Sequence, residues 1–281
     1  MSLNGIDIIY WINLDRSKER RKHMETVLKD PVFDGIKNER IKAIDGEKDS
    51  HAIRKNIDIH ITDPKSINLK VSFPEYACLL SHLEAIRKFS ESNYKYAIIF
   101  EDDITLEYKK YWEKDLSDLI KEAPKDWQII RLQRAPFESN DISFKQSFKK
   151  WDFIKRSVTF PNKAVTGDWG AYAYLIKNSA AKQLIKRIYK NNKYKLADNY
   201  PLLADAYMYK MLRTYTYKYP YFTYRSGKKN STTVHKEIGN ECRKTLMDKL
   251  YKKYNKTRKH NKTNKRNKTN KHNKDKTYKS K

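Results

Sequence analysis

Glycine is scarce in this sequence, with only seven among 281 residues. None of the seven forms G-x-G-x-x-G or G-x-x-x-x-G-K, the patterns in which a backbone loop cradles phosphates. The G-x-S-x-G elbow of serine hydrolases and the H-E-x-x-H zinc pair are also absent. A Rossmann-type or P-loop nucleotide site is therefore disfavoured. If phosphates bind, a metal ion and basic side chains must hold them.

Cysteines and long apolar runs are equally few. Two cysteines, Cys78 and Cys242, cannot build a disulfide framework, and no four-ligand zinc spacing occurs. The sequence has no apolar run of 18 residues and no charged leader before an apolar core, so we expect no transmembrane segment and no signal peptide. The default prediction is a soluble cytoplasmic protein. The Lys- and Asn-rich composition suggests an AT-rich genome, such as that of a large DNA virus or a protist parasite, and a viral source would place the protein in the host cytoplasm.

Positive charge is abundant but unevenly distributed. Of the formal net charge of +27, residues 251–281 carry +13, from fourteen Lys and Arg against one Asp, which leaves +14 for residues 1–250. A basic body suits anionic ligands. The segment 251–281 has too few apolar groups to form a core, and we expect a disordered tail that could dock on an acidic partner or be dispensable. Residues 1–250 are predicted to form one domain.

Strand-like and helix-like segments alternate along that domain. This order predicts a single α/β domain with a mainly parallel central sheet flanked by helices. Residues 47–71 are expected to be a loop with at most short helices, and residues 133–163 a long loop or lid. Expected strands lie at 6–12, 40–44, 96–100, 127–132, 171–176 and 214–219, and expected helices begin after Ser17, Ser72 and Asn178 or lie near 111–120 and 206–211.

The most informative stretch is an apolar run, Tyr96–Phe100, that leads directly into Glu101, Asp102 and Asp103. Such a run is typical of a strand buried on both faces, and ligands bind where such strands leave an open α/β sheet. In an extended chain Glu101 and Asp103 point to one side and Asp102 to the other. Glu101 and Asp103 could therefore share a Mg²⁺ or Mn²⁺ ion, which would relieve their mutual repulsion. The alternative is a solvated acidic turn.

Polar residues also end the first strand. Asn13, Asp15 and Arg16 should lie beside the same sheet edge, and Arg16 and Arg20 could meet a nucleotide phosphate or base there. The alternative is that both arginines are surface charges. His82 shares a helix face with apolar residues, where a histidine is more often a satisfied core residue than a ligand.

The order of these motifs resembles glycosyltransferase family 25. The resemblance covers about residues 6–235. The family's I-N-L-D-R segment is matched by Ile12-Asn13-Leu14-Asp15-Arg16 with Arg20, and its A-x-D-G segment by Ala43-Ile44-Asp45-Gly46. Its G-C-x-x-S-H segment is matched by Cys78-Leu79-Leu80-Ser81-His82, with Ala77 in place of glycine, and its L-E-D-D segment by Ile99-Phe100-Glu101-Asp102-Asp103. The G-x-x-A-Y-L-I and A-x-x-L patterns are matched by Gly170–Ile176 with Ala181 and Leu184.

This resemblance implies a GT-A-like fold, a sugar nucleotide donor (most often a UDP-hexose), a divalent metal ion (Mn²⁺ or Mg²⁺) and an inverting transfer. The hexose would be galactose or glucose, and the acceptor a glycan or protein hydroxyl such as a lipopolysaccharide sugar or a collagen-like hydroxylysine. The implied residues are Asp103, Glu101 and His235 for the metal, Asn13, Leu14, Asp15, Arg16, Arg20, Asp45 and Asp102 for the donor, Asp205 for the base with Asp198 in reserve, and His82 near the donor or the metal shell.

Two other functional classes remain open at this point. The net charge and the 21 tyrosines also suit a nucleic-acid-binding protein, although we expect no specific nucleic acid partner. A catalytically inactive scaffold that resembles a glycosyltransferase is the other alternative.

Overall fold

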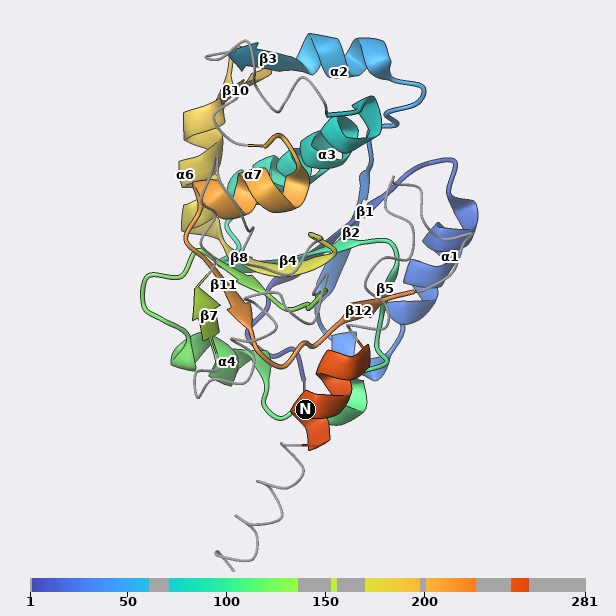
Figure 1. Ribbon diagram of the computed structural model, residues 1–281, viewed down its shortest axis with the longest axis vertical. Coiled ribbons are helices and arrows are strands. Elements are labelled where there is room, and N and C mark those ends of the chain that lie inside the picture. The colour runs from blue at the N-terminus through green and yellow to red at the C-terminus, as the bar shows by residue number, and fades with distance from the viewer. Residues whose placement is uncertain are drawn as a thin grey trace, which may run out of the picture.

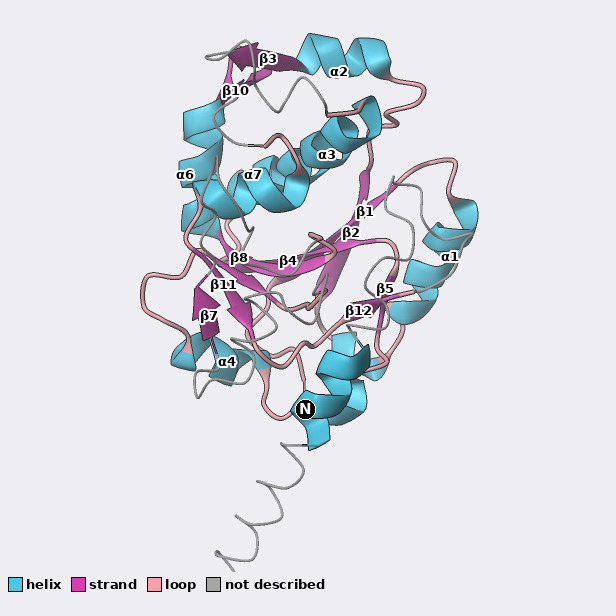
Figure 2. Cartoon of the chain, viewed as in Figure 1, coloured by secondary structure: helices cyan, strands magenta, loops and turns pink. Residues whose placement is uncertain are grey.

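A seven-stranded sheet runs through the middle of the molecule (Figures 1 and 2). The computed structural model describes residues 2–60, 71–135, 153–155, 170–197, 201–225 and 244–252. The strand order is β2-β1-β4-β8-β6-β11-β7. The strands are β1 Ile8–Asn13, β2 Lys37–Lys42, β4 Tyr96–Glu101, β6 Ile129–Arg131, β7 Phe153–Lys155, β8 Ala173–Lys177 and β11 Thr214–Tyr217.

The direction of the strands confirms a mainly parallel sheet. Strand β1 is parallel to β2 and β4, and β6 is parallel to β11. Strand β8 is antiparallel to both β4 and β6, and β7 is antiparallel to β11. Five strands therefore run in one direction, and β7 and β8 run in the other.

Helices cover both faces of the sheet. Helices α3 (Phe73–Ser90), α6 (Asn178–Ile188) and α7 (Ala204–Met211) pack on one face, where α3 contacts the other two (Figure 1). The other face packs against α1 (Lys18–Val27) and α4 (Leu116–Glu122). Alternate residues of β1 and β4 belong to the two apolar clusters, as expected for strands buried on both sides.

Smaller elements surround this core. Strands β3 (Ile57–His60), β10 (Lys193–Ala197) and β9 (Tyr189–Lys190) form a second sheet, and β5 (Ile104–Thr105) pairs with β12 (Thr223–Tyr224). The remaining elements are the short helices α2 (Ser50–Asn56), η1 (Pro31–Phe33), η3 (Lys109–Tyr111) and a helix at residues 244–252. In the last of these, Tyr251 is buried and stacks on Tyr111.

Residues 47–71, expected to be a loop with at most short helices, thus contain helix α2 and also a strand. The strand β3 was missed because its partner β10 lies more than a hundred residues away, and a short strand of this kind depends on that pairing. Similarly, β7 lies within the stretch 133–163 that was expected to be irregular.

The helix starts agree with the sequence to different degrees. Helix α3 begins after Ser72 as predicted, and Ser72 and Glu75 form a capping box in which the Glu75 carboxylate accepts from the Ser72 backbone N–H at 2.8 Å. Ser17 occupies the N-cap position of α1, but its side chain makes no capping hydrogen bond. The prediction of Asn178 as a cap is wrong. Helix α6 already includes Asn178, whose side-chain amide instead donates to the carbonyl of Phe89 at 2.7 Å.

Part of the prediction lies outside the described residues. This holds for Asp198, His235, most of the segment 133–163 and the tail beyond residue 252. The division into residues 1–250 and 251–281 stays a prediction. Among the residues that the structure describes, no helix is both long and apolar enough to cross a bilayer.

Candidate active site

The sequence motifs meet at one edge of the central sheet. In the parallel register Asn13 of β1 lies opposite Lys42 of β2, and Ile12 lies opposite Glu101 of β4, so these three strands end together. Strand β8 runs the other way, so it begins at this edge, three residues after Gly170. The carboxyl ends of parallel strands are the usual ligand edge of an α/β sheet.

The acidic triplet lies at the centre of this edge. Its chain turns after Glu101, so the extended geometry predicted for the triplet ends with its first residue. The Asp102 carboxylate accepts a hydrogen bond from Nδ2 of Asn13 at 2.5 Å and pairs with Nη2 of Arg20. The same arginine nitrogen lies 3.0 Å from Oδ2 of Asp103. Asp102 and Asp103 therefore share one cation, instead of pointing to opposite sides.

Burial raises the pKa values of Asp102 and Asp103. Desolvation raises the pKa of Asp103 to about 7, with the neighbouring Glu101 and Asp102 charges adding to the rise and Arg20 opposing it. Burial likewise raises the pKa of Asp102 against the effect of Arg20. Within the described residues, Oδ1 of Asp103 is buried and has no hydrogen-bond partner. The site thus holds more acceptor capacity than the described protein groups satisfy.

Arg20 is itself mostly buried, with 13% of its side chain exposed. It was expected to bind the donor, and its guanidinium group instead faces the two aspartates in this structure. Contact with a donor phosphate would require Arg20 to share or exchange those partners. The nearby carboxylates raise the pKa of Arg20 although its burial opposes the rise, so it remains charged.

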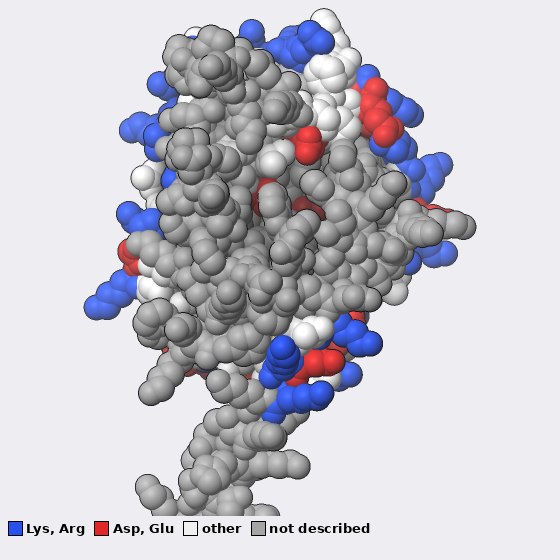
Figure 3. All heavy atoms as spheres, in the orientation of Figure 1, with Lys and Arg blue, Asp and Glu red and all other residues white. Residues whose placement is uncertain are grey.

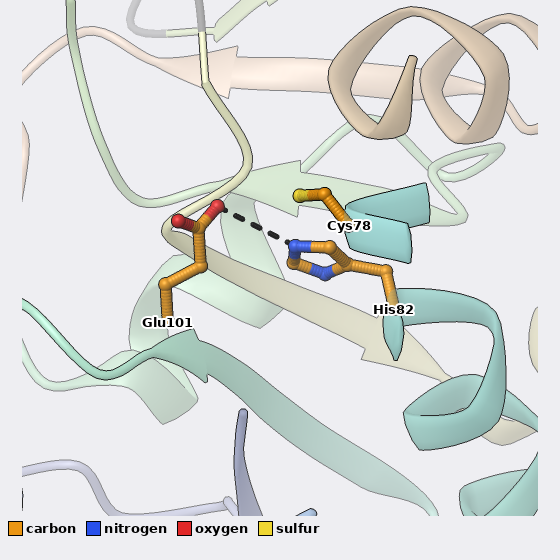
Figure 4. Close-up of side chains that lie close together, drawn as sticks. All are labelled: Cys78, His82 and Glu101. Carbon is orange, nitrogen blue, oxygen red and sulfur yellow. Dashed lines mark ion pairs between the residues drawn. The ribbon is translucent and has the colours of Figure 1, made fainter. Parts of the chain in front are cut away.

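His82 joins helix α3 to the acidic strand end. The ring is fully buried, with Nε2 3.4 Å from Oε1 of Glu101 and Nδ1 3.2 Å from the hydroxyl of Tyr174. Burial pushes the pKa of Glu101 upward, but the contact with His82 outweighs this effect and the pKa is lowered overall. His82 is thus a core residue that also faces the site, which combines the two alternatives raised by the sequence. Cys78 lies one helical turn before it and points toward the same carboxylate (Figure 4).

The A-x-D-G turn is held by two further contacts. The Asp45 carboxylate accepts from Nε of Arg16 at 2.5 Å, and the hydroxyl of Ser81 accepts from the backbone N–H of Ile44 at 2.9 Å. Gly46 packs so closely on the start of α3 that a Cβ placed there would lie 2.6 Å from the carbonyl oxygen of Phe73. The glycine is therefore required for the close approach of this turn to the start of α3.

The remaining candidates, Asp15, Leu14 and Asp205, contact residues other than the acidic triplet. Asp15 follows the end of β1, is half exposed, and pairs with Arg40 and with Lys42, the latter at 3.0 Å. Leu14 contributes its backbone carbonyl, which accepts from the N–H of Ser17 at 2.9 Å. Asp205 lies in the first turn of α7 and accepts from the backbone N–H of Gly170 at 2.7 Å. The structure thus brings Asp205 to the edge at which β8 begins.

Sequence reasoning missed a group of buried polar residues at the ends of β6 and β11. Nη2 of Arg131 donates to the carbonyl of Gly170 at 3.2 Å, and Oε1 of Gln133 accepts from the N–H of Ala173 at 2.7 Å. Arg134 is also buried and donates to the carbonyl of Lys218 at 3.3 Å. The available signal was the polar residues that interrupt an otherwise apolar strand, since buried polar groups normally need defined partners.

Comparison with known proteins agrees with this arrangement. The model of glycosyltransferase family 25 (LPS biosynthesis protein) matches residues 6–208, which include all five motifs. The chain belongs to glycosyltransferase family 25. The suspected resemblance is therefore confirmed.

Similar proteins include two from animals and one from a bacterium. Procollagen galactosyltransferase 2 of Homo sapiens is 30% identical over 136 residues, which are 46% of this chain and 21% of the human protein. A glycosyltransferase 25 family member of Aedes aegypti is 27% identical over 191 residues, covering 65% of this chain and 28% of the insect protein. Lipooligosaccharide biosynthesis protein lic2B of Haemophilus influenzae is 26% identical over 213 residues, covering 75% of this chain and 73% of that protein.

This family 25 chain thus spans between a fifth and a third of the length of the two animal relatives. Among solved structures, the galactosyltransferase LgtC with donor and acceptor sugar analogues aligns with a TM-score of 0.29 and 12% identity. That alignment covers 63% of this chain and 59% of LgtC. A TM-score of this size is too small to compare the two sites.

Proposed function

We propose that this protein transfers a hexosyl group, galactose or glucose, from a UDP-sugar to a hydroxyl group of a glycan or protein. The family supports the reaction class. The observation that carries the proposal is the buried acidic edge, where Asp103 has one oxygen without a described partner beside two further carboxylates. Such a group favours a cation, and a cation is what a departing diphosphate needs.

The residues present fit a divalent metal ion of the hard type. Asp103 and Glu101 would hold it, because carboxylate oxygens suit Mn²⁺ and Mg²⁺ and Asp103 Oδ1 has unused acceptor capacity. When bound, the ion would neutralise negative charge that develops on the diphosphate. Arg20, which already contacts both aspartates, would supply a second positive charge on the α1 side of the site. Asn13 orients Asp102 through its amide.

Asp205 is the proposed general base. Its carboxylate is held at the start of α7 by the N–H of Gly170, so one oxygen is fixed and the group is oriented. An acceptor hydroxyl within hydrogen-bond reach would give its proton to this carboxylate as it attacks. In an inverting transfer the base lies opposite the leaving diphosphate. Asp198 is the alternative base, and His235 the additional metal ligand implied by the family; both stay predictions.

A donor screen tests the proposal. Purified protein with Mn²⁺ would be offered a panel of UDP-sugars, UDP release would be measured, and candidate acceptors would be analysed by mass. Asp103→Ala and Asp205→Asn should each abolish most of the transfer, while Asp34→Asn, at an exposed aspartate outside the five motifs, should not. If both site variants fold and keep full transfer, the assignment is wrong. A wild-type protein that releases no UDP with any donor would favour an inactive scaffold.

Charge alone favours a second candidate, nonspecific binding of nucleic acid. On the face shown in Figure 3, Lys and Arg side chains of the described residues stand around the rim, interspersed with acidic ones. No single basic patch is formed there by the described part of the chain. Removal of the residues after Tyr251 separates the candidates, because transfer should survive and any salt-sensitive affinity for nucleic acid should largely vanish. A cytoplasmic location stays a prediction.

A further inference from the structure

Three side chains of different chemistry converge beside the acidic edge. One ligand atom each from Cys78, His82 and Glu101 lies within 4.8 Å of the others (Figure 4). Cys78 and His82 are four residues apart on α3, so both side chains lie on one face of the helix, and Glu101 ends β4 opposite them. Figure 4 shows the sulfur, the imidazole ring and the carboxylate all directed toward one point between them.

His82 is oriented as a ligand. The Tyr174 hydroxyl lies 3.2 Å from Nδ1 of His82 and can donate to the sulfur of Met208 at 3.7 Å, so its oxygen is left to accept from Nδ1–H. This arrangement directs Nε2 toward Glu101 and Cys78. Nε2 belongs to a fully buried side chain and has no hydrogen-bond partner among the described residues. Metal-bound histidines commonly donate their second ring N–H to such an outer partner.

The spacing fits a tetrahedral zinc ion. With Zn–N and Zn–O bonds of about 2.0–2.1 Å, the edge between a nitrogen and an oxygen ligand is about 3.3–3.4 Å. The distance between His82 Nε2 and Glu101 Oε1 is 3.4 Å. A Zn–S bond of about 2.3 Å requires edges of about 3.6 Å, so the Cys78 sulfur would need to approach each of the other two ligand atoms by up to about 1.2 Å. A helix face and a strand end can accommodate that movement with a change of side-chain torsion.

The donor set differs from that of the acidic edge. Sulfur and imidazole ligands select Zn²⁺ and similar borderline or soft ions, whereas the carboxylates Glu101 and Asp103 suit Mn²⁺ or Mg²⁺. A reactive cysteine is the competing explanation for the thiol. The direction of the Cys78 sulfur, toward the imidazole ring of His82 and the carboxylate of Glu101, favours a ligand over an isolated reactive thiol.

We propose that Cys78, His82 and Glu101 form a zinc site, with water as the fourth ligand, and that zinc there withdraws Glu101 from the neighbouring carboxylates. The site is separate from the proposed Mn²⁺ position but shares one ligand with it. Zinc binding does not depend on the proposed transfer. Its consequence, that zinc inhibits the enzyme by competing for Glu101, rests on that proposed function.

The test uses Co²⁺ as a spectroscopic substitute for zinc on the full chain after removal of bound metal with a chelator. A cobalt–thiolate charge-transfer band with a 1:1 endpoint is expected for the wild type, and Zn²⁺ should displace it stoichiometrically. Cys78→Ser should abolish the band and lower zinc affinity by roughly 100-fold or more, beyond what loss of an outer-shell partner costs. Cys242→Ser, at the other cysteine of the chain, should leave both unchanged. Absence of the band in the wild type, or its loss only in Cys242→Ser, overturns the proposal.

Three more variants distinguish loss of a zinc ligand from misfolding and from loss of a neighbouring carboxylate. His82→Gln keeps the thiol but should also lose the tetrahedral spectrum, which covers the case in which Cys78→Ser fails to fold. Tyr174→Phe should weaken zinc binding by about 10–100-fold, because it removes the partner of His82 Nδ1. Asp103→Asn should retain the thiolate band, since Asp103 is not a zinc ligand here. A band that vanishes in Asp103→Asn but survives in His82→Gln would contradict the assignment.

An activity measurement forms a second, independent arm. Zinc added to the Mn²⁺-loaded enzyme should suppress UDP release by the wild type and by Cys242→Ser, and Cys78→Ser should lose this sensitivity. If no UDP-sugar is used at all, the proposed function fails while the cobalt spectrum still decides the zinc site. If transfer occurs and zinc sensitivity persists in Cys78→Ser, the competition for Glu101 is contradicted.

Discussion

Nδ2 of Asn13 donates a hydrogen bond to Oδ2 of Asp102 at 2.5 Å, linking the end of β1 to the turn after β4 across 89 positions of sequence. The other amide atom, Oδ1, accepts from Nε of Arg40 at 3.0 Å. Asn13 is almost completely buried. The Asn13 side chain therefore connects Arg40 of β2 and Asp102 after β4 to β1, which lies between those two strands.

Asn13→Ala should destabilise the fold by about 1–3 kcal/mol, because it leaves buried polar partners unsatisfied. Urea unfolding monitored by circular dichroism measures this. Asn4→Ala removes an exposed amide and serves as the matched control. Equal midpoints for the two variants would show that the contact with Asp102 contributes nothing to stability.

Arg20→Ala should cost about 3–5 kcal/mol in the absence of metal, because it removes the cation shared by the buried Asp102 and Asp103, which must then be protonated or left unpaired. Mn²⁺ should raise the melting temperature of this variant more than that of the wild type, since the ion would replace the missing positive charge. Differential scanning calorimetry with and without Mn²⁺ measures both effects. Arg21→Ala is the control: Arg21 forms an exposed pair with Glu25 on the same helix, worth about 0.3–0.5 kcal/mol. A Mn²⁺ shift no larger than in the wild type would argue against ion binding at these aspartates.

Gly46→Ala should destabilise the protein by about 1–3 kcal/mol through overpacking, because the new methyl group would meet the backbone of Phe73 and Pro74. Backbone atoms cannot rotate away as a side chain can. The start of α3 should shift, so amide exchange should accelerate around residues 73–76 in the variant. Unchanged exchange there would show that the turn accommodates the methyl group by itself.

The lowered pKa of Asp45 predicts that the stability of the protein depends on pH. Its burial opposes ionisation, but hydrogen bonds from Arg16 and from the backbone of Glu47 outweigh this and lower its pKa overall. Because the folded pKa lies below the unfolded value, the stabilisation is present above the unfolded pKa of about 3.9 and is lost as the pH falls through the folded pKa. Asp45→Asn should therefore be less stable than the wild type at neutral pH, and the difference should shrink as the pH falls below about 4. A difference that is constant with pH would contradict the linkage.

Asp205→Asn should reduce transfer by about 10²–10⁴-fold, the usual contribution of a general base. The amide oxygen of asparagine can still accept from the Gly170 N–H, so the fold should survive. UDP release and acceptor modification are both measured, with Asp118→Asn as an exposed control in α4. Full transfer by Asp205→Asn would move the role of base to another carboxylate.

Much of the fold could be predicted because its signals are local. The apolar runs of β1 and β4 and the capping box of α3 identify buried strands and a helix start from adjacent residues. Strand β3 could not be found in this way, because its pairing with β10 is decided by chain folding. Asn178 failed as a cap since its amide finds a partner on α3.

The site shows the same division. Parallel strands end at a common edge, so the proximity of Asn13 to the acidic triplet follows from the order of the motifs. The order of the motifs does not predict which partner each side chain contacts. Arg20 can reach a phosphate or a carboxylate from the same backbone position, and spacing along the chain cannot distinguish the two. The convergence of Cys78 on Glu101 likewise depends on how α3 crosses β4.

The position of Arg20 has a consequence for the stability of the acidic edge by itself. A cluster of buried carboxylates without any cation would repel itself and strain the fold. With a guanidinium group built in between Asp102 and Asp103, the protein supplies its own counterion. If the acidic edge binds metal and donor as proposed, Arg20 would keep it folded and partly neutralised before they bind.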